Sequence, residues 1–185
     1  MLFNAHSRLA GQHAFLSASS YHWTNYTEDK LDAVFLASMA AKRGNELHAF
    51  AHNAIRLGIR LPRTSKTLNM YVNDAVGYRM TPEQILYYSD NCFGTADTIS
   101  FRDKLLRVHD LKTGATPTSE RQLEVYVALF CLEYRVKPFE IEIEMRIYQN
   151  DEVRVYEGDK DIILHIMDRI ITFDKRIEAI KRDAQ

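Results

Sequence analysis

The chain of 185 residues has only two cysteines, Cys92 and Cys131. Two thiols cannot by themselves build a disulfide framework or a four-thiolate metal site. No apolar run approaches the roughly 20 residues that span a bilayer. The N-terminal stretch also lacks the apolar core of a secretory signal peptide. The sequence therefore predicts a cytoplasmic protein that has no membrane partner.

Linkers, repeats and low-complexity tracts are also missing from the sequence. Hydrophobic residues make up 46% of the chain and charged residues 26%, which is ordinary for a globular protein and excludes collagen-like, disordered and coiled-coil classes. A chain of this length favours one domain over residues 1–185. Within it we expect a mainly helical part over 1–80, a sheet with a helix over 84–158 and a closing helix over 160–182.

Charge is balanced overall but uneven along the chain. There are 24 Lys and Arg against 25 Asp and Glu, so the net charge of −1 gives no global nucleic-acid signal. Residues 1–70 carry eight basic and four acidic side chains, whereas residues 139–161 carry three and eight. The basic part, residues 1–70, could bind phosphate groups. Ordinary variation of a protein surface explains the asymmetry equally well.

Hydrophobic periodicity and capping signals divide the chain into nine elements. Thr27 suits a helix N-cap, Gly58 suits a helix stop, and Gly44 suggests a break between them. Apolar and polar residues alternate over 139–148, from Phe139 on, as in a half-buried strand. We expect helices over 28–58, 67–79, 119–135 and 160–182, with strands over 84–89, 92–101, 105–111, 139–148 and 152–156. This order predicts an α/β fold with a mixed sheet.

Two carboxylates fall on an otherwise apolar strand face. Asp103 and Lys104 suit the two-residue tip of a hairpin, and that turn pairs Asp97 with Asp110 and leaves Lys112 on the same face. Opposed acids repel each other, and Mg²⁺ or Mn²⁺ would offset the repulsion because both ions favour carboxylate ligands. The alternative is a turn shifted by one residue, which separates the acids and leaves Asp110 and Lys112 as a surface ion pair.

Four short patterns complete the signal: Gly44-x-x-x-His48, Gly94-x-x-Asp97, Asp110-x-Lys112-Thr-Gly and Gln122-x-x-x-Tyr126. In this order they resemble the RecB-like branch of the PD-(D/E)XK nuclease superfamily. The resemblance implies a restriction-endonuclease-like α/β core, in which helices flank a mixed central sheet. It also implies a metal-dependent DNA nuclease, most naturally an exonuclease that acts on DNA ends or single strands in phage recombination, repair or genome processing.

The resemblance also assigns roles to individual residues. A Mg²⁺ or Mn²⁺ ion would be held by His48, Asp97, Asp110 and the backbone carbonyl of Leu111. Lys112 would position or activate water, Gln122 and Tyr126 would orient Lys112 and the DNA backbone, and Glu46 is an accessory candidate. The segment with Ser19, Tyr21, His22 and Trp23 matches an entry segment near DNA in relatives, although core packing is the favoured interpretation for Trp23.

Simpler interpretations of these residues stay open. Ser119 and Gln122 have the spacing of a helix capping box, Tyr126 could be a core residue, and His48 and His52 could form a helical metal pair or be interface histidines. The iron–sulfur cysteines of many relatives are absent here, so no cluster is expected. The expected partner is DNA, with a homo-oligomer or a recombination protein as further candidates, in the host cytoplasm if the chain is phage-encoded. The alternatives are a non-catalytic nucleic-acid- or protein-binding module and a structure-specific endonuclease.

Overall fold

The computed structural model describes residues 4–184. Its contacts divide the chain into a unit that ends at Asn45 and a unit from Glu46 on. The second unit contains every residue for which the sequence predicts a role in catalysis or metal binding. Within the described part of the chain, no helix is long and apolar enough to cross a membrane.

The first unit is helical. It contains the short 3-10 segments Ser7–Leu9 and Ala18–Asn25 and the beginning of helix α1, Glu28–Arg56. Thr27 accepts a hydrogen bond from the backbone N–H of Lys30 at 3.3 Å, as expected of an N-cap. The break expected at Gly44 is wrong: the helix continues through it, because one glycine costs a helix only about 1 kcal/mol. Trp23 is half-buried and joins neither hydrophobic core of the described residues.

The second unit is built on a mixed sheet of five strands in the order β1-β2-β3-β4-β5. Strands β3 and β4 are parallel, and the other neighbours are antiparallel. The α/β fold and the mixed sheet flanked by helices are therefore confirmed. The elements that follow α1 are α2 (Thr67–Gly77), β1 (Thr81–Ser89), β2 (Cys92–Arg102), β3 (Leu105–Leu111), α3 (Arg121–Tyr134), β4 (Glu142–Gln149), β5 (Glu152–Glu157) and α4 (Lys160–Asp183).

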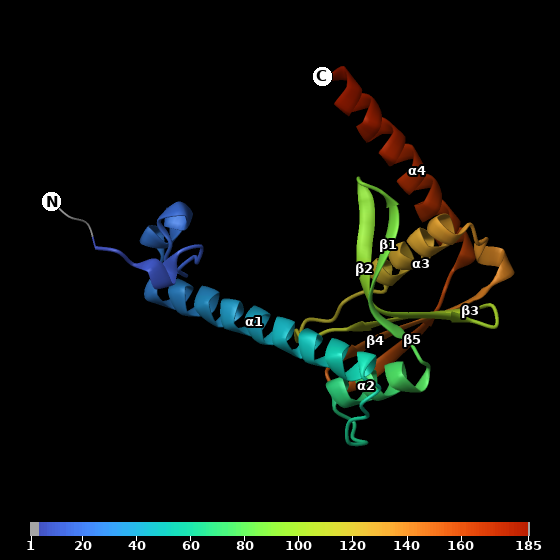
Figure 1. Ribbon diagram of the computed structural model, residues 1–185, viewed down its shortest axis with the longest axis horizontal. Coiled ribbons are helices and arrows are strands. Elements are labelled where there is room, and N and C mark those ends of the chain that lie inside the picture. Colours follow the sequence, from blue (N-terminus) through green and yellow to red (C-terminus); the bar gives the residue numbers. More distant parts are fainter. Residues whose placement is uncertain (1–3, 185) are drawn as a thin grey trace. The chain divides into compact units, whose positions relative to one another are not determined.

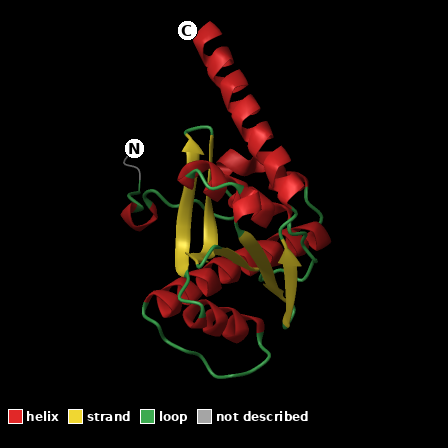
Figure 2. Cartoon of the chain, turned by 90° about the vertical axis from the view of Figure 1, so that its right-hand side faces the viewer, coloured by secondary structure: helices red, strands yellow, loops and turns green. Residues whose placement is uncertain are grey.

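Each face of the sheet has its own core. Val108 of β3 packs with α3 and α4 in the larger core, whereas Leu111 packs with α1 and α2 in the smaller one. Because side chains alternate along a strand, α2 and α3 lie on opposite faces of the sheet, as Figure 1 shows. Figure 2 shows the sheet between these helices and α4 extending beyond it.

The predicted elements are found, with two further differences in detail. The strand expected from residue 139 begins at Glu142, because Pro138–Glu140 forms a 3-10 turn that leaves Phe139 59% exposed. The strand expected from residue 84 begins earlier, at Thr81, so that Pro82 lies within β1. Since β1 is an edge strand of the sheet, a proline there does not remove a hydrogen bond from a central ladder.

Candidate active site

The hairpin of β2 and β3 has the register that the sequence predicts. Ile99 lies opposite Val108, and Thr98 lies opposite His109. At the tip, Asp103 and Lys104 have φ values of 50° and 62°. Positive φ at both central residues is typical of a type I′ turn, whose twist matches that of the strands. This register brings Asp97 and Asp110 to the same end of the hairpin, one step beyond the last pair of the ladder.

The Asp97 carboxylate connects three segments of the second unit. Its Oδ2 accepts a hydrogen bond from the backbone N–H of Leu111 at 2.9 Å, and Nδ1 of His48, on α1, lies 3.5 Å from the same oxygen. Burial raises the pKa of Asp97, and the neighbouring charge of Asp110 raises it further, against the opposing effect of the Leu111 N–H and His48. The negative charge of the Asp97 carboxylate is therefore not fully compensated by its neighbours.

The Asp110 carboxylate is buried, with 3% of the residue exposed. Its Oδ1 accepts a hydrogen bond from Nζ of Lys112 at 3.0 Å. Its Oδ2 is buried without any hydrogen-bond partner among residues 4–184. Burial raises the pKa of Asp110, and Lys112 only partly opposes this effect. Buried carboxylate oxygens without partners are unusual because their desolvation is costly.

A chain of hydrogen bonds runs from Asp110 to α3. Lys112 Nζ donates to Oε1 of Gln122 at 2.9 Å, and Nε2 of Gln122 donates to the Tyr126 hydroxyl at 2.8 Å. One turn of helix separates Gln122 from Tyr126, so both side chains lie on the same helix face. The capping box that the spacing of Ser119 and Gln122 left open is not formed, because α3 begins one residue later than that pattern needs and its N-cap, Glu120, makes no side-chain capping bond.

Gly94 gives the Tyr126 ring room to approach the sheet. A Cβ atom at Gly94 would lie 3.0 Å from Cε1 of Tyr126, which is closer than carbon atoms normally approach. The glycine of the Gly94-x-x-Asp97 pattern therefore has a packing role here. It lets the Tyr126 ring lie close to β2 while its hydroxyl contacts Gln122.

The segment after Lys112 is held by residues that the sequence analysis missed. The Lys112 backbone N–H donates to the carbonyl of Tyr148 in β4 at 2.9 Å. Gln149, which is buried, donates to the carbonyl oxygens of Gly114 and Thr116 at 2.6 and 2.8 Å. Arg154 donates to the carbonyl of Thr118 at 2.9 Å. A single sequence gives no sign of these roles, because each depends on β4 lying parallel to β3.

A cleft of ≈ 370 Å³ opens beside Lys112. It is lined by Leu47 of α1, by Thr67 and Leu68 of α2, and by Leu111, Lys112, Thr113, Asn150 and Asp151. Lys112 is thus the one residue of the Asp110–Lys112–Gln122–Tyr126 chain in the cleft lining. The arrangement joins a carboxylate pair to an ammonium whose side chain is 25% exposed.

Two candidate residues lie apart from this cluster. Glu46 is exposed, and Nδ1 of His52 lies 3.2 Å from Oε2 of Glu83. His48 and His52 therefore face different carboxylates, and the structure does not present them as a pair for one ion. Ser19, Tyr21, His22 and Trp23 belong to the first unit. Cys92 and Cys131 are free thiols at the beginning of β2 and inside α3.

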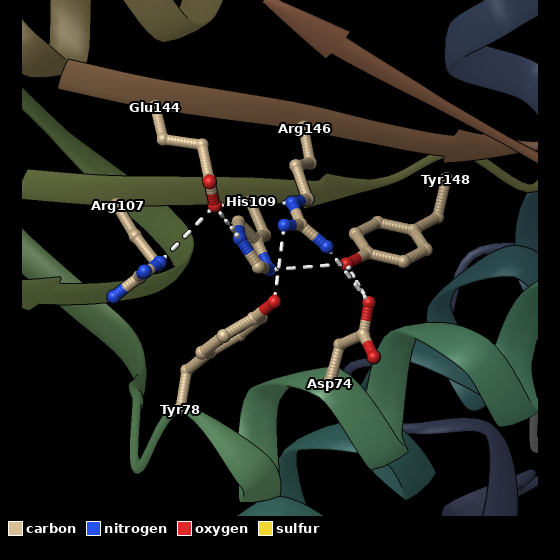
Figure 3. Close-up of polar contacts among 7 residues, drawn as sticks. All are labelled: Asp74, Tyr78, Arg107, His109, Glu144, Arg146 and Tyr148. Carbon is tan, nitrogen blue, oxygen red and sulfur yellow. Dashed lines mark hydrogen bonds and ion pairs between the residues drawn. The ribbon is translucent and has the colours of Figure 1, made fainter.

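A second polar cluster lies on the opposite face of the same strands, and Figure 3 shows it. Glu144 Oε1 accepts hydrogen bonds from Nε of both Arg107 and Arg146, at 3.1 and 3.0 Å. Arg146 Nη1 and the Tyr148 hydroxyl donate to Oδ2 of Asp74 at 3.1 and 2.7 Å. We call this set the α2-face network; it consists of Asp74, Tyr78, Arg107, His109, Glu144, Arg146 and Tyr148.

The α2-face network overturns one detail of the sequence analysis. The polar side of the strand at 139–148 was expected to face water, but α2 covers its later part, so that Tyr148 is fully buried and the Arg146 side chain is 16% exposed, whereas Glu142 is exposed. His109 lies at the centre of the network. The Tyr148 hydroxyl donates to Asp74, and its oxygen also lies 3.3 Å from Nδ1 of His109. Burial lowers the pKa of His109 to about 3, which keeps the ring neutral.

Among the described residues, no three His, Cys, Asp or Glu side chains are already gathered into a metal-binding group. The structure brings together a smaller set of groups: the two carboxylates, the Leu111 backbone and His48 beside Asp97. Comparison of the chain with protein-family models, with curated proteins and with solved structures finds no match.

Proposed function

We propose that the protein is a divalent-metal-dependent DNA nuclease with a site of the PD-(D/E)XK type. The observation that carries this proposal is the Asp110 carboxylate. It is buried, its Oδ2 has no partner among residues 4–184, and it lies at the same strand end as a second acid with a raised pKa. Such an arrangement destabilises the protein alone, and a ligand of positive charge would relieve it.

A divalent cation fits this donor set. The uncompensated oxygen of Asp110 and the carboxylate of Asp97 are the hard oxygen ligands that Mg²⁺ and Mn²⁺ prefer. The backbone carbonyl of Leu111 and the imidazole of His48 would complete the set. When bound, such an ion lowers the pKa of a water molecule and neutralises charge that develops on a phosphodiester.

Lys112 supplies the second part of the proposed chemistry. Its ammonium has three N–H donors, and Asp110 and Gln122 take two of them. The third remains for a water molecule or a phosphate oxygen in the adjacent cleft. Gln122, whose amide is fixed by the Tyr126 hydroxyl, keeps the ammonium from folding away from the site.

The preference for DNA ends or single strands comes from the resemblance to RecB-like nucleases. On that basis we propose an exonuclease of phage recombination, repair or genome processing, with DNA as its partner. The site chemistry itself does not distinguish an exonuclease from an endonuclease. The form of DNA that the protein cuts, linear or circular, therefore decides between an exonuclease and an endonuclease.

The test is digestion of end-labelled linear DNA and of covalently closed circular DNA, each with Mg²⁺, Mn²⁺ or EDTA. We expect metal-dependent cleavage of the linear form, and its loss in Asp110→Asn. The matched control is Asp168→Asn, which makes the same change on an exposed position of α4. Cleavage of the circle would show an endonuclease. DNA binding without cleavage in any metal, or an active Asp110→Asn protein, would contradict the proposal and favour a non-catalytic binding module.

A further inference from the structure

An open hollow of ≈ 540 Å³ lies along α2 and the loop that precedes it, away from the cleft at Lys112. Arg60, Arg63, Thr64 and Ser65 of the loop line it, together with Asn73 and Asp74 of α2. None of these residues belongs to the carboxylate site described above. The hollow is therefore a separate surface feature of the second unit, and we call it the arginine hollow.

The arginine hollow has an excess of positive charge. Within residues 4–184, neither Arg60 nor Arg63 has a carboxylate within 4.0 Å of its guanidinium. Asp74 also lines the hollow, but its Oδ2 is already bound by Arg146 and Tyr148. Lys66, in the same loop, is paired with Asp151 at 2.7 Å. The two arginines are therefore the charges left for a ligand.

The loop that carries the arginines is held in place by two asparagines of α2. Asn73 accepts the N–H of Leu61 at 2.8 Å and donates to the carbonyl of Leu61 at 3.0 Å. Asn69 donates to the carbonyl of Pro62 at 3.0 Å and to Oγ1 of Thr64 at 2.9 Å. These contacts fix the backbone between Arg60 and Thr64. A preorganised loop loses less entropy when a ligand binds to it.

The free polar groups of the hollow are mostly donors. Thr64 Oγ1 already accepts hydrogen bonds from Asn69 and from the N–H of Lys66 at 3.3 Å, so its O–H remains as a donor. Each guanidinium has five N–H donors and no acceptor. Phosphate oxygens only accept hydrogen bonds, and arginine binds them with two parallel N–H groups. This surface therefore suits phosphate better than a mixed donor and acceptor ligand.

Helix α2 connects the arginine hollow to the cleft at Lys112. Thr67 and Leu68 line the cleft, and Met70 and Asn73 line the hollow. Six residues of helix, from Thr67 to Asn73, span about 9 Å. Phosphates follow one another along a nucleic-acid strand at about 3.4 Å or more. A strand that occupied both sites would therefore need to be only a few nucleotides long.

From this geometry we infer that the arginine hollow binds the phosphate backbone of a single nucleic-acid strand, a few nucleotides away from the bond in the cleft. The inference deepens the proposed function and rests on it for the identity of the strand. It assigns Arg60 and Arg63 to substrate binding. It also makes the substrate a strand that extends beyond the cleft, because a mononucleotide could not reach the hollow.

The test is the binding of a fluorescently labelled single-stranded oligothymidylate, measured by anisotropy in EDTA over a series of salt concentrations. We expect Arg60→Gln/Arg63→Gln to bind more weakly and to lower the slope of log affinity against log salt by roughly 1.4, or 0.7 for each arginine. Arg60→Lys/Arg63→Lys should keep most of the slope. The matched control is Lys175→Gln/Arg176→Gln, two exposed positions of α4 that also lose two charges.

Three results would overturn the inference. The hollow variant could bind like the control variant. Poly-glutamate could compete with the oligonucleotide as well as an unlabelled strand does, which would identify an acidic protein segment as the ligand. The lysine variant could lose as much of the slope as the glutamine variant does. Because EDTA prevents cleavage, these results are independent of the proposed function, which is tested separately by wild-type digestion with Mn²⁺.

Discussion

The two faces of strand β3 both bury charged side chains, and they compensate them differently. On the α2 face, Asp74 and Glu144 are matched by Arg107 and Arg146, and Tyr148 adds a further donor. On the α3 face, Asp97 and Asp110 share one ammonium, that of Lys112, and an imidazole 3.5 Å from Asp97.

Under the proposed function, this difference separates a structural cluster on the α2 face from a metal-binding cluster on the α3 face. A balanced network of buried charges is stable without a ligand, and breaking it is costly. A cluster with more carboxylates than cations is strained until a cation arrives. Strand β3 thus contributes to charged residues that stabilise the fold on one face. On the other face it contributes to carboxylates whose mutual repulsion the rest of the fold must offset. Four predictions test this contrast, in order of decreasing effect.

The largest effect is expected for Lys112→Ala. If the ammonium positions water or phosphate, its loss should reduce the rate of DNA cleavage on the order of 10³-fold, while metal binding remains. The measurement is the initial rate of cleavage with Mn²⁺. Lys181→Ala, which breaks an exposed pair with Glu178 on α4, is the control and should retain the wild-type rate. A Lys112→Ala protein that cleaves DNA as fast as this control would remove the catalytic role of the lysine.

The next effect concerns the α2-face network. Arg146→Ala leaves the carboxylates of Asp74 and Glu144 without their shared cation, so we expect the free energy of unfolding to fall by roughly 3 kcal/mol. Urea denaturation measures it. Arg102→Ala, at an exposed position near the hairpin tip, should change stability by less than about 0.5 kcal/mol. Equal effects of the two substitutions would show that the network does not stabilise the fold.

The third effect depends on pH through His109. Burial lowers the pKa of His109 from 6.5 to about 3, and the charges of Arg146 and Arg107 contribute. Because the unfolded state binds this proton more readily, the stability from neutral His109 is complete above pH 6.5 and is lost as the pH falls toward 3. The loss should reach about 1.4 kcal/mol per pH unit. His109→Gln should flatten unfolding free energy against pH in this range, and an unchanged slope would contradict the assignment.

The smallest effect is a difference of sign between two identical substitutions. In EDTA, Asp110→Asn should raise the free energy of unfolding by about 1 kcal/mol, because it removes a buried charge opposite Asp97. Asp74→Asn should lower it by a similar amount, because it breaks the pair with Arg146. Thermal melts measure both. Mn²⁺ should stabilise the wild type and Asp74→Asn but not Asp110→Asn. If both substitutions changed the unfolding free energy in EDTA in the same direction, the two clusters would not differ in charge compensation.

Local patterns predicted much of this structure. The turn at Asp103 and Lys104 fixed the register of β2 and β3, and that register brings Asp97 and Asp110 to one end. The helical spacing of Gln122 and Tyr126 predicted a shared face, which the hydrogen bond between these two side chains confirms. These features depend on residues close in sequence, so a single chain is enough to read them.

Features that depend on distant segments were missed. The α2-face network needs α2 to cover β4, and the side chains at Arg146 and Tyr148 look like a solvated strand face until that packing is known. Gln149 and Arg154 hold the loop after Lys112 only because β4 lies parallel to β3. No alternation or spacing encodes such contacts, since each depends on which elements become neighbours.

The parallel pairing of β3 with β4 also orders how the molecule folds. Asp97 and Asp110 meet through a local hairpin, whereas Leu105 pairs with Glu142, 37 residues along the chain. Long-range pairing is slow because the intervening chain must close first. We therefore expect a nascent chain that ends before β4 to form the acidic hairpin while the segment from Lys112 to Thr118 remains loose. The backbone of Lys112 would be held against β4 only after residues up to Gln149 have emerged from the ribosome.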